Sequence, residues 1–393
     1  LLLLVYLFIN HLSGRIEYID KFMNNISLNK IAWITLRKNK LAFFSFCYIL
    51  FSLFVALFVV LISPDNSPNA NEMHIQIAKK KPLTEIKFLH IAEENAVHSS
   101  FLKSFFVGVE KNYKRIPVDY YKKLDFQKYS DSVKSAYSFD ENKKILEYCV
   151  YGSNKKIVHI GDYEIVSQKF WLGTDKFGRD YLSRVLHGTR ISLSVGLISV
   201  FISLIIGITL GLLAGYYRGF VDNLIMWLVN VIWSIPTLLM VIAITLALGK
   251  GFWQVFIAIG FTMWVEVARV VRGQVLIVRE LEYIEAGKVL AYKSYRIIFK
   301  HILPNVLGPI IVISAANFAS AILIESGLSF LGIGAQPPIA SWGNMIKDHY
   351  SYIIMDKAYL AIVPGVAIMS FVLAFMLLGN GLREVFDVKK TNN

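Results

Sequence analysis

The sequence predicts an all-α polytopic membrane protein with six transmembrane helices and a small α+β extracytoplasmic insertion after the first helix. Three observations predict this fold class. Hydrophobic residues make up 55% of the 393 residues and charged residues only 18%, which is more apolar than a soluble chain of this length needs to be. Six apolar runs each approach the length of about 20 residues that crosses a bilayer. A stretch of mixed polarity, residues 66–167, separates the first run from the second.

We assign the spans in chain order from these apolar runs. They cover residues 41–63, 191–216, 224–248, 252–271, 306–328 and 358–378. The first run is the cleanest and is stopped by Pro64. The third contains Pro236, which lacks a backbone N–H, so we expect a kink there.

The N-terminal residues need a separate interpretation. The apolar stretch 1–9 is too short to span a membrane, and no small-residue cleavage site of a signal peptide follows it. We interpret residues 1–22 as an extension upstream of a start at Met23, with an interfacial helix as the alternative. Residues 23–40 then form a polar segment before the first span.

Lysine and arginine in short flanking segments predict the orientation, because such residues are retained on the cytoplasmic side. Basic groups before the first span, between the fourth and fifth, and after the sixth all fall on one side. They comprise Arg37, Lys38 and Lys40; Arg272, Arg279, Lys288, Lys293, Arg296 and Lys300; and Arg383, Lys389 and Lys390. We therefore expect both termini, the segment 272–304 and the tail 386–393 to be cytoplasmic. Residues 64–185 then lie outside, and residues 186–385 form the transmembrane core.

Charge and cysteine usage argue against two classes of protein. The net charge of +13 is spread over loops beside apolar spans, a distribution that sets membrane topology and does not indicate nucleic-acid binding. Cys47 lies in an apolar run and Cys149 in a polar region, so they cannot form a disulfide. Redox chemistry and a zinc site both lack their ligands, and we predict no catalytic, cofactor or metal site.

The insertion contains short, weakly alternating runs such as EIKFLHI and KKIVHIGDYEIV, which indicate strands of a small α+β domain. One group of residues there has a metal-like spacing: His90, Glu94 and His98 would share one face of a helix. The segment before them is typical of a strand, however, and no third strong ligand is evident. We favour a solvated surface for these residues.

The charged stretch EYIEAGKVLAYKSYRIIFKHILPN, which begins at Glu282, predicts a short helix, a turn and a second helix. One apolar stripe is expected on the first helix, formed by Tyr283, Ile284, Gly287, Leu290 and Ala291. The second helical run ends at Pro304, which can open the next helix. A solvated loop does not need an outward apolar stripe, so we interpret the stretch as a docking element for a soluble partner.

A few residues inside the spans invite interpretation. Gly207, Gly211 and Gly215 recur every four residues, a spacing that lets helices approach closely, either within this chain or at a subunit interface. Ionisable groups at membrane depth are costly. Glu266 and Arg269 are candidates either for a pathway or for an ion pair with each other, and we favour the pair. Glu325 is expected either to face a pathway or to cap the irregular segment GLSFLGIG.

The charged stretch carries a resemblance to a known loop. Glu285, Ala286 and Gly287, then Ala291, then Ile302, Leu303 and Pro304 resemble the EAA coupling loop of ABC importer permeases. Gly287 replaces the second alanine of that pattern, and Ala291 stands at the position of its turn glycine. The turn must therefore form without a residue that favours positive φ.

Further runs extend the resemblance to most of residues 171–388. WLGTDKFGRDYLSRVLHGTRISLSVG, SIPTLL, ARVVRGQVL and ESGLSFLGIGAQPPIASWG are similar to the C-type subunit of dipeptide and oligopeptide permeases. The resemblance implies a MetI-like permease in the bacterial inner membrane that pairs with a homologous second permease. It also implies two cytoplasmic ATPases at the coupling loop 272–304 and an extracytoplasmic binding protein that delivers the solute. No phosphate-binding GxxxxGK[ST] loop occurs in the chain, so the ATPase activity belongs to partner subunits and this chain is not an enzyme.

The resemblance favours peptides as the solute, with nickel or another small solute on the same scaffold as the alternative. The sequence argues against two other classes of protein. A membrane enzyme would carry HExxH, GxSxG or paired intramembrane aspartates, and the sequence has none of them. A six-span signalling or regulatory protein would not need a coupling helix.

Overall fold

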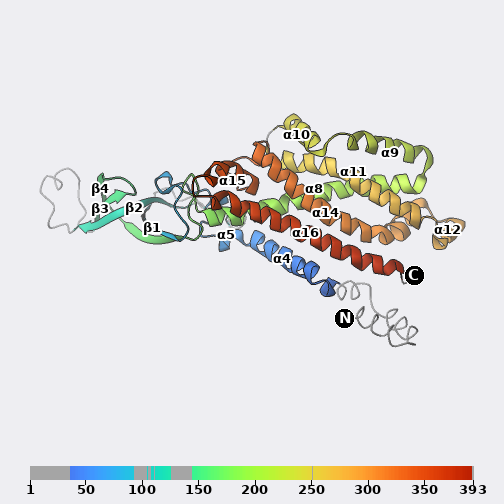
Figure 1. Cartoon of the computed structure of the whole chain (residues 1–393), viewed down its shortest axis with the longest axis horizontal. Helices are drawn as coiled ribbons and strands as arrows, with labels where there is room; N and C mark the ends of the chain where they lie inside the picture. The colour runs from blue at the N-terminus through green and yellow to red at the C-terminus, as the bar shows by residue number, and fades with distance from the viewer. Residues whose placement is uncertain are drawn as a thin grey trace, which may run out of the picture.

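The computed structural model describes residues 36–92, 104, 108–109, 111–124, 144–249 and 251–391. The molecule is elongated, with a bundle of long helices and a β-sheet that extends from one end of the bundle (Figure 1). The short helix α12 and the C-terminus lie at the opposite end (Figure 1). The N-terminal segment 1–22 lies outside the described residues.

The bundle consists of helices that follow the predicted apolar runs. In chain order they are α4 (Lys40–Leu57), α5 (Val59–Ile62), α8 (Tyr181–Tyr217), α9 (Gly219–Trp233), α10 (Thr237–Leu248), α11 (Phe252–Val278), α12 (Glu282–Val289), α13 (Ser294–Arg296), the π-helical turn η4 (Ile297–Ile302), α14 (Leu303–Leu331), α15 (Trp342–His349), the 3₁₀ turn η5 (Tyr350–Ile353) and α16 (Tyr359–Thr391). Cys47, on α4, and Cys149, in the sheet, are free.

Five of these helices, or runs of helix, are long and apolar enough to cross a membrane. They are Lys40–Leu57, Tyr181–Tyr217, Phe252–Val278, Ser294–Leu331 and Tyr359–Glu384. The run predicted as the third span is a broken pair, because α9 and α10 meet at an angle of 90°. The described chain therefore has five candidate spans, or six if the bent pair is one span. The break lies at Pro236, whose ring and missing N–H interrupt the helical hydrogen bonds.

Helices α8 and α11 form the closest packing in the bundle. Gly207, Gly211 and Gly215 on α8 face α11 of the same chain. A Cβ on Gly211 would lie 2.7 Å from the carbonyl oxygen of Ala268 and 2.7 Å from the Cβ of Val271. Only glycine leaves room for such close approach of two backbones. The glycine repeat thus lies in an interface within this subunit.

The insertion is an antiparallel sheet of five strands in the order β4-β3-β2-β1-β5. The strands are β1 (Thr84–Ala92), β2 (Tyr113–Leu124), β3 (Ile145–Val150), β4 (Lys156–Ile160) and β5 (Tyr163–Phe170), preceded by the 3₁₀ turns η1 (Pro68–Ala70) and η2 (Ile75–Ile77). Side chains of β1 alternate between two apolar clusters: Phe88 packs with Ile77 and Phe170, and Leu89 packs with Leu146. The expected strands are present, and Ser104, between β1 and β2, is helical.

Candidate functional site

Helix α12 is the element that the EAA-like pattern singles out. It lies at the end of the bundle away from the sheet (Figure 1). Glu282 and Glu285 occupy its first turn and Lys288 its last turn. Acidic residues near the N-terminus of a helix and basic residues near its C-terminus are stabilised by the helix dipole. The sequence therefore favours this short helix although it projects from the bundle.

The two faces of α12 have different environments. Ile284 and Gly287 are buried, and Ile284 packs into the same core cluster as Ile297 and Ile302. Glu285 and Ala286 are exposed, as are the apolar side chains of Tyr283, Val289 and Leu290. The expectation of one continuous outward stripe was therefore wrong for Ile284 and Gly287, because the following helical turn covers them. The outer face is still apolar at Val289, which is 86% exposed.

The turn after α12 is closed by two hydrogen bonds between backbone groups. The N–H of Ala291 donates to the carbonyl of Lys288 at 2.9 Å, and the N–H of Tyr292 donates to the carbonyl of Gly287 at 3.0 Å. This is the Schellman arrangement, in which a residue of positive φ follows the helix. Ala291 takes that position with φ of 53°. An alanine thus adopts the left-handed conformation that glycine would adopt with less strain.

The other residues of the pattern lie where the chain re-enters the bundle. Ile302 is buried at the end of the π-helical turn η4, and Leu303 and Pro304 begin α14. The N–H of Leu303 donates to the carbonyl of Ile298, five residues earlier. Pro304 cannot donate and its ring disfavours a regular helical turn before it, which accounts for the wider π turn.

Glu266 and Arg269 on α11 do not pair with each other as expected. Arg269 donates to the Oδ1 of Asn230 at 2.7 Å, and its guanidinium lies 3.4 Å from the ring centre of Trp233. Both partners belong to α9, which the bend at Pro236 brings against α11. Among the described residues, the carboxylate of Glu266 has no hydrogen bond or ion pair, and it is exposed.

Glu325 is buried in α14 with 1% of its surface exposed. One oxygen, Oε1, accepts hydrogen bonds from Ser329 at 2.6 Å and from Ser341 at 2.8 Å. The hydroxyl of Ser329 also accepts a hydrogen bond from the backbone N–H of Ala335, in the irregular segment after α14. These contacts place Glu325 beneath that segment, in line with the capping alternative.

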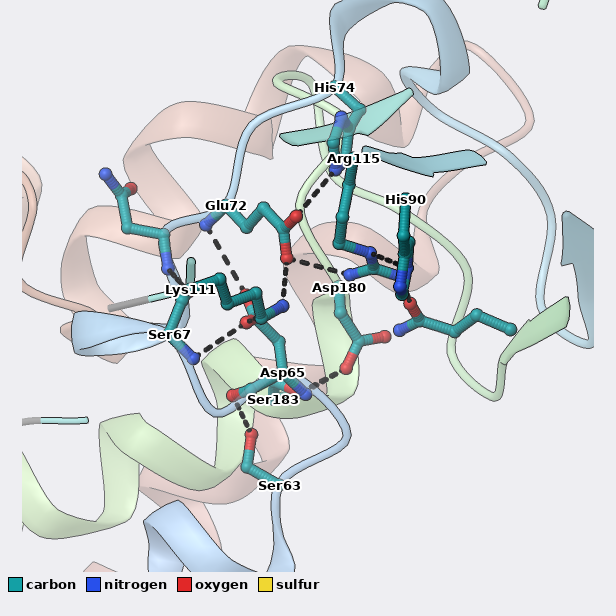
Figure 2. A network of polar contacts seen from close by, with 12 residues as sticks. Ser63, Asp65, Ser67, Glu72, His74, His90, Lys111, Arg115, Asp180 and Ser183 are labelled. Atoms are coloured by element: carbon teal, nitrogen blue, oxygen red, sulfur yellow. Dashed lines mark hydrogen bonds and ion pairs between the residues drawn. The ribbon is translucent and has the colours of Figure 1, made fainter. Parts of the chain in front are cut away.

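A buried polar network, which the sequence did not indicate, joins the sheet to the bundle (Figure 2). Glu72 accepts hydrogen bonds from Lys111 and, at 2.8 Å, from Arg115 of β2, and its other oxygen lies 3.2 Å from the Nε2 of His74. Burial alone would raise the pKa of Glu72, but the hydrogen bond of His74 and the charges of Arg115 and Lys111 hold this pKa well below its ordinary value.

The network continues to the start of α8 (Figure 2). The backbone N–H of Asp65 donates to the hydroxyl of Ser183 at 2.9 Å, and the N–H of Ser183 donates to Asp180 at 3.0 Å. Asp180 is thus the N-cap of α8. Burial raises the pKa of Asp180 to about 6, although its hydrogen bonds from Ser183 oppose the shift. The partners come from distant parts of the sequence, so no local motif could have revealed them.

The metal-like group in the insertion is only partly within the described residues. His90 lies in β1, where its ring stacks on Tyr113 and its Nε2 is 3.1 Å from the Nε of Arg115. Burial and the charge of Arg115 lower the pKa of His90. Glu94 and His98 lie outside the described residues.

Two family models match parts of this chain. A family described as "Binding-protein-dependent transport system inner membrane component" matches residues 207–391. A second, "N-terminal TM domain of oligopeptide transport permease C", matches residues 27–82. Among solved structures, a chain of the inward-facing MetNI methionine ABC transporter aligns with 52% of this chain and 97% of that chain, with 18% identity and a TM-score of 0.43.

Two curated proteins are much more similar in sequence. The glutathione transport system permease protein GsiD of Pectobacterium atrosepticum is 42% identical over 223 residues, which cover 57% of this chain and 74% of that protein. The dipeptide transport system permease protein DppC of Bacillus subtilis is 41% identical over 223 residues, which cover 57% of this chain and 70% of that protein. The chain therefore belongs to the family of inner membrane components of binding-protein-dependent transport systems.

Proposed function

We propose that this chain is a permease subunit of an ATP-driven importer and forms part of the membrane pathway for peptides. The observation that carries the proposal is α12, a short helix with an exposed apolar face at one end of a transmembrane bundle. The family is defined by transport that depends on a binding protein, which supplies the solute from outside. A projecting helix is what a transport subunit needs to receive a conformational change from a separate ATPase.

The arrangement of the ends supports the proposed orientation. The Nδ2 of Asn39, just before α4, donates to Glu384 of α16 at 3.0 Å, so the first and last spans meet at one end of the bundle. Helix α12 lies at that same end, and the sheet lies at the other (Figure 1). The basic flanks of α4 and of segment 272–304 therefore share one side, which the positive-inside rule assigns to the cytoplasm. Both termini would be cytoplasmic, with 64–185 outside.

The partners follow from the family and from the exposed surfaces. We propose two cytoplasmic ATPases at α12, a homologous second permease beside the bundle, and a solute-binding protein on the side of the sheet. Large apolar side chains on α9 and α10 are exposed, including Trp227 at 61% and Leu239 at 60%. Lipid or the second permease would cover them. The chain itself would not be catalytic.

Peptides are the proposed solute because the relatives at 40% identity or more carry names that refer to dipeptide or glutathione transport. Glutathione is itself a small peptide. The names of these relatives favour peptides over nickel as the solute.

The coupling role of α12 can be tested by association with the ATPases. Glu285→Lys reverses an exposed charge, and Val289→Asp places a charge on the exposed apolar face. Gly287 is buried, so a bulky residue there would disturb the loop itself and is less informative. We expect both variants to insert normally and to lose the ATPases on purification from membranes in mild detergent.

The control is Val158→Asp in β4, an exposed valine at the opposite end of the molecule. This variant should retain the ATPases. Mass spectrometry of the co-purified proteins is the measurement. Recovery of the ATPases at normal levels with both Glu285→Lys and Val289→Asp would refute the proposed role of α12.

A further inference from the structure

A cavity of about 300 Å³ lies where the break between α9 and α10 meets α11 and α14. Its lining is mainly apolar and includes Trp233, Met240 and Leu323. The polar lining residues include Thr237, Ser320 and Glu266, and Glu266 is the one ionisable residue among those that line the cavity in the described chain. Pockets for small ligands have this character, an apolar wall with a few polar groups that fix orientation.

The position of Glu266 makes an ionised side chain costly unless it has a partner. It lies near the midpoint of α11, a candidate membrane span. Carboxylates at such depth normally pair with a cation or line a water-filled cavity, and they mark pathways for solutes. Glu266 has no ion pair among the described residues, so its charge is available to something that enters the cavity.

The nearest cationic residues on α11 are already engaged. Arg269 donates to Asn230 and stacks on Trp233. Arg272 donates two hydrogen bonds to Asp222, at 2.5 and 2.7 Å. These contacts hold α9 against α11 and so fix the wall of the cavity, and neither guanidinium forms an ion pair with Glu266 in the described chain, although the Nε of Arg269 has no hydrogen-bond partner there.

We propose that the carboxylate of Glu266 binds the positively charged amino group of a peptide as the peptide crosses the membrane. This inference rests on the proposed function and adds the chemical group that the pathway recognises. An ammonium group supplies three donors and a full charge to the carboxylate. The hydroxyls of Thr237 and Ser320, both exposed, can serve the peptide's amide groups, and the apolar wall can contact its side chains.

The second permease offers the competing explanation, since a cation on that subunit could pair with Glu266. The recessed volume beside the carboxylate favours a small solute, because a subunit contact does not require a cavity of this size. The two explanations predict different effects of removing the charge.

The test uses the complete transporter, with both permeases, the ATPases and the binding protein, in proteoliposomes. Uptake of dialanine is compared with uptake of N-acetyl-dialanine, which lacks the charged amino group, both at concentrations that saturate the binding protein. The preference of the binding protein is the same for every permease variant. A change in the uptake ratio between variants therefore reports the pathway.

We expect Glu266→Gln to reduce the preference for dialanine by about tenfold, the scale of one charge-assisted contact. Glu266→Asp, which keeps the charge, should retain part of the preference, and Glu384→Gln, outside the cavity, should retain all of it.

Two results would overturn the inference: an unchanged uptake ratio in Glu266→Gln, or loss of the second permease from that variant's complex. The latter would assign Glu266 to the subunit interface. If the unaltered, fully assembled transporter imported neither peptide, the peptide function itself would be refuted, and that result is distinct from the other two.

Discussion

Replacing Ala291 by glycine should stabilise α12. Ala291 has φ of 53°, in the left-handed region that costs an L-residue about 1 kcal/mol or more relative to glycine. The Schellman bonds from Ala291 and Tyr292 to α12 require this conformation. Glycine should therefore lower the free energy of the closed turn by about 1 kcal/mol. This corresponds to amide hydrogen exchange about five times slower in the last turn of α12.

A matched control is available on the same helix. Ala286 is also exposed but lies inside α12, where glycine is about 1 kcal/mol less favourable than alanine. Ala286→Gly should therefore speed exchange about fivefold, the opposite direction from Ala291→Gly. The assay is hydrogen exchange with mass spectrometry on the protein in lipid nanodiscs, corrected for intrinsic exchange rates. If both variants shifted exchange in the same direction, the left-handed turn at Ala291 would not be what limits α12.

Three further predictions concern the bundle and the network. Gly211→Leu should destabilise the protein by about 1–3 kcal/mol, because the Cβ of the new leucine would meet the backbone of α11. The control is Gly273→Leu, whose Cβ would meet open space and which should be nearly neutral. Thermal unfolding of both variants is the measurement. Glu72 has a lowered pKa, so its ionised form stabilises the fold above its ordinary pKa of about 4.5, and this contribution is lost as the pH falls. Glu72→Gln should therefore cost about 3 kcal/mol at pH 7, since it removes the carboxylate charge that faces the partly buried cations of Arg115 and Lys111, and less at pH 3. Asp180 has a pKa raised to about 6, so the stability that its protonated form provides is lost as the pH rises from about 4 to 6. Asp180→Asn keeps the N-cap and should raise the melting temperature at pH 7.5 but not at pH 4. If the substitution changed the melting temperature equally at both pH values, this reasoning would be contradicted.

The sequence by itself determined the helices that can cross a membrane. Hydrophobicity over about 20 residues is a local property, and each predicted apolar run is helical in the structure. The strand EIKFLHI within β1 and the break at Pro236 were also predictable, because alternation and the missing N–H of proline are local features. The pattern from Glu285 to Pro304 was enough to indicate a projecting helix.

Only the tertiary structure decided which residues meet. Ile284 and Gly287 are buried because the chain that follows α12 folds back over them. Helical periodicity alone does not determine which apolar face of a helix is covered. Arg269 contacts Asn230 and Trp233 because α9 lies against α11, although Glu266 is closer in sequence. Glu72 is joined to Arg115 across 43 positions of the chain. Ion pairs and cavities depend on how separate elements approach one another, and that information does not reside in any single stretch of sequence.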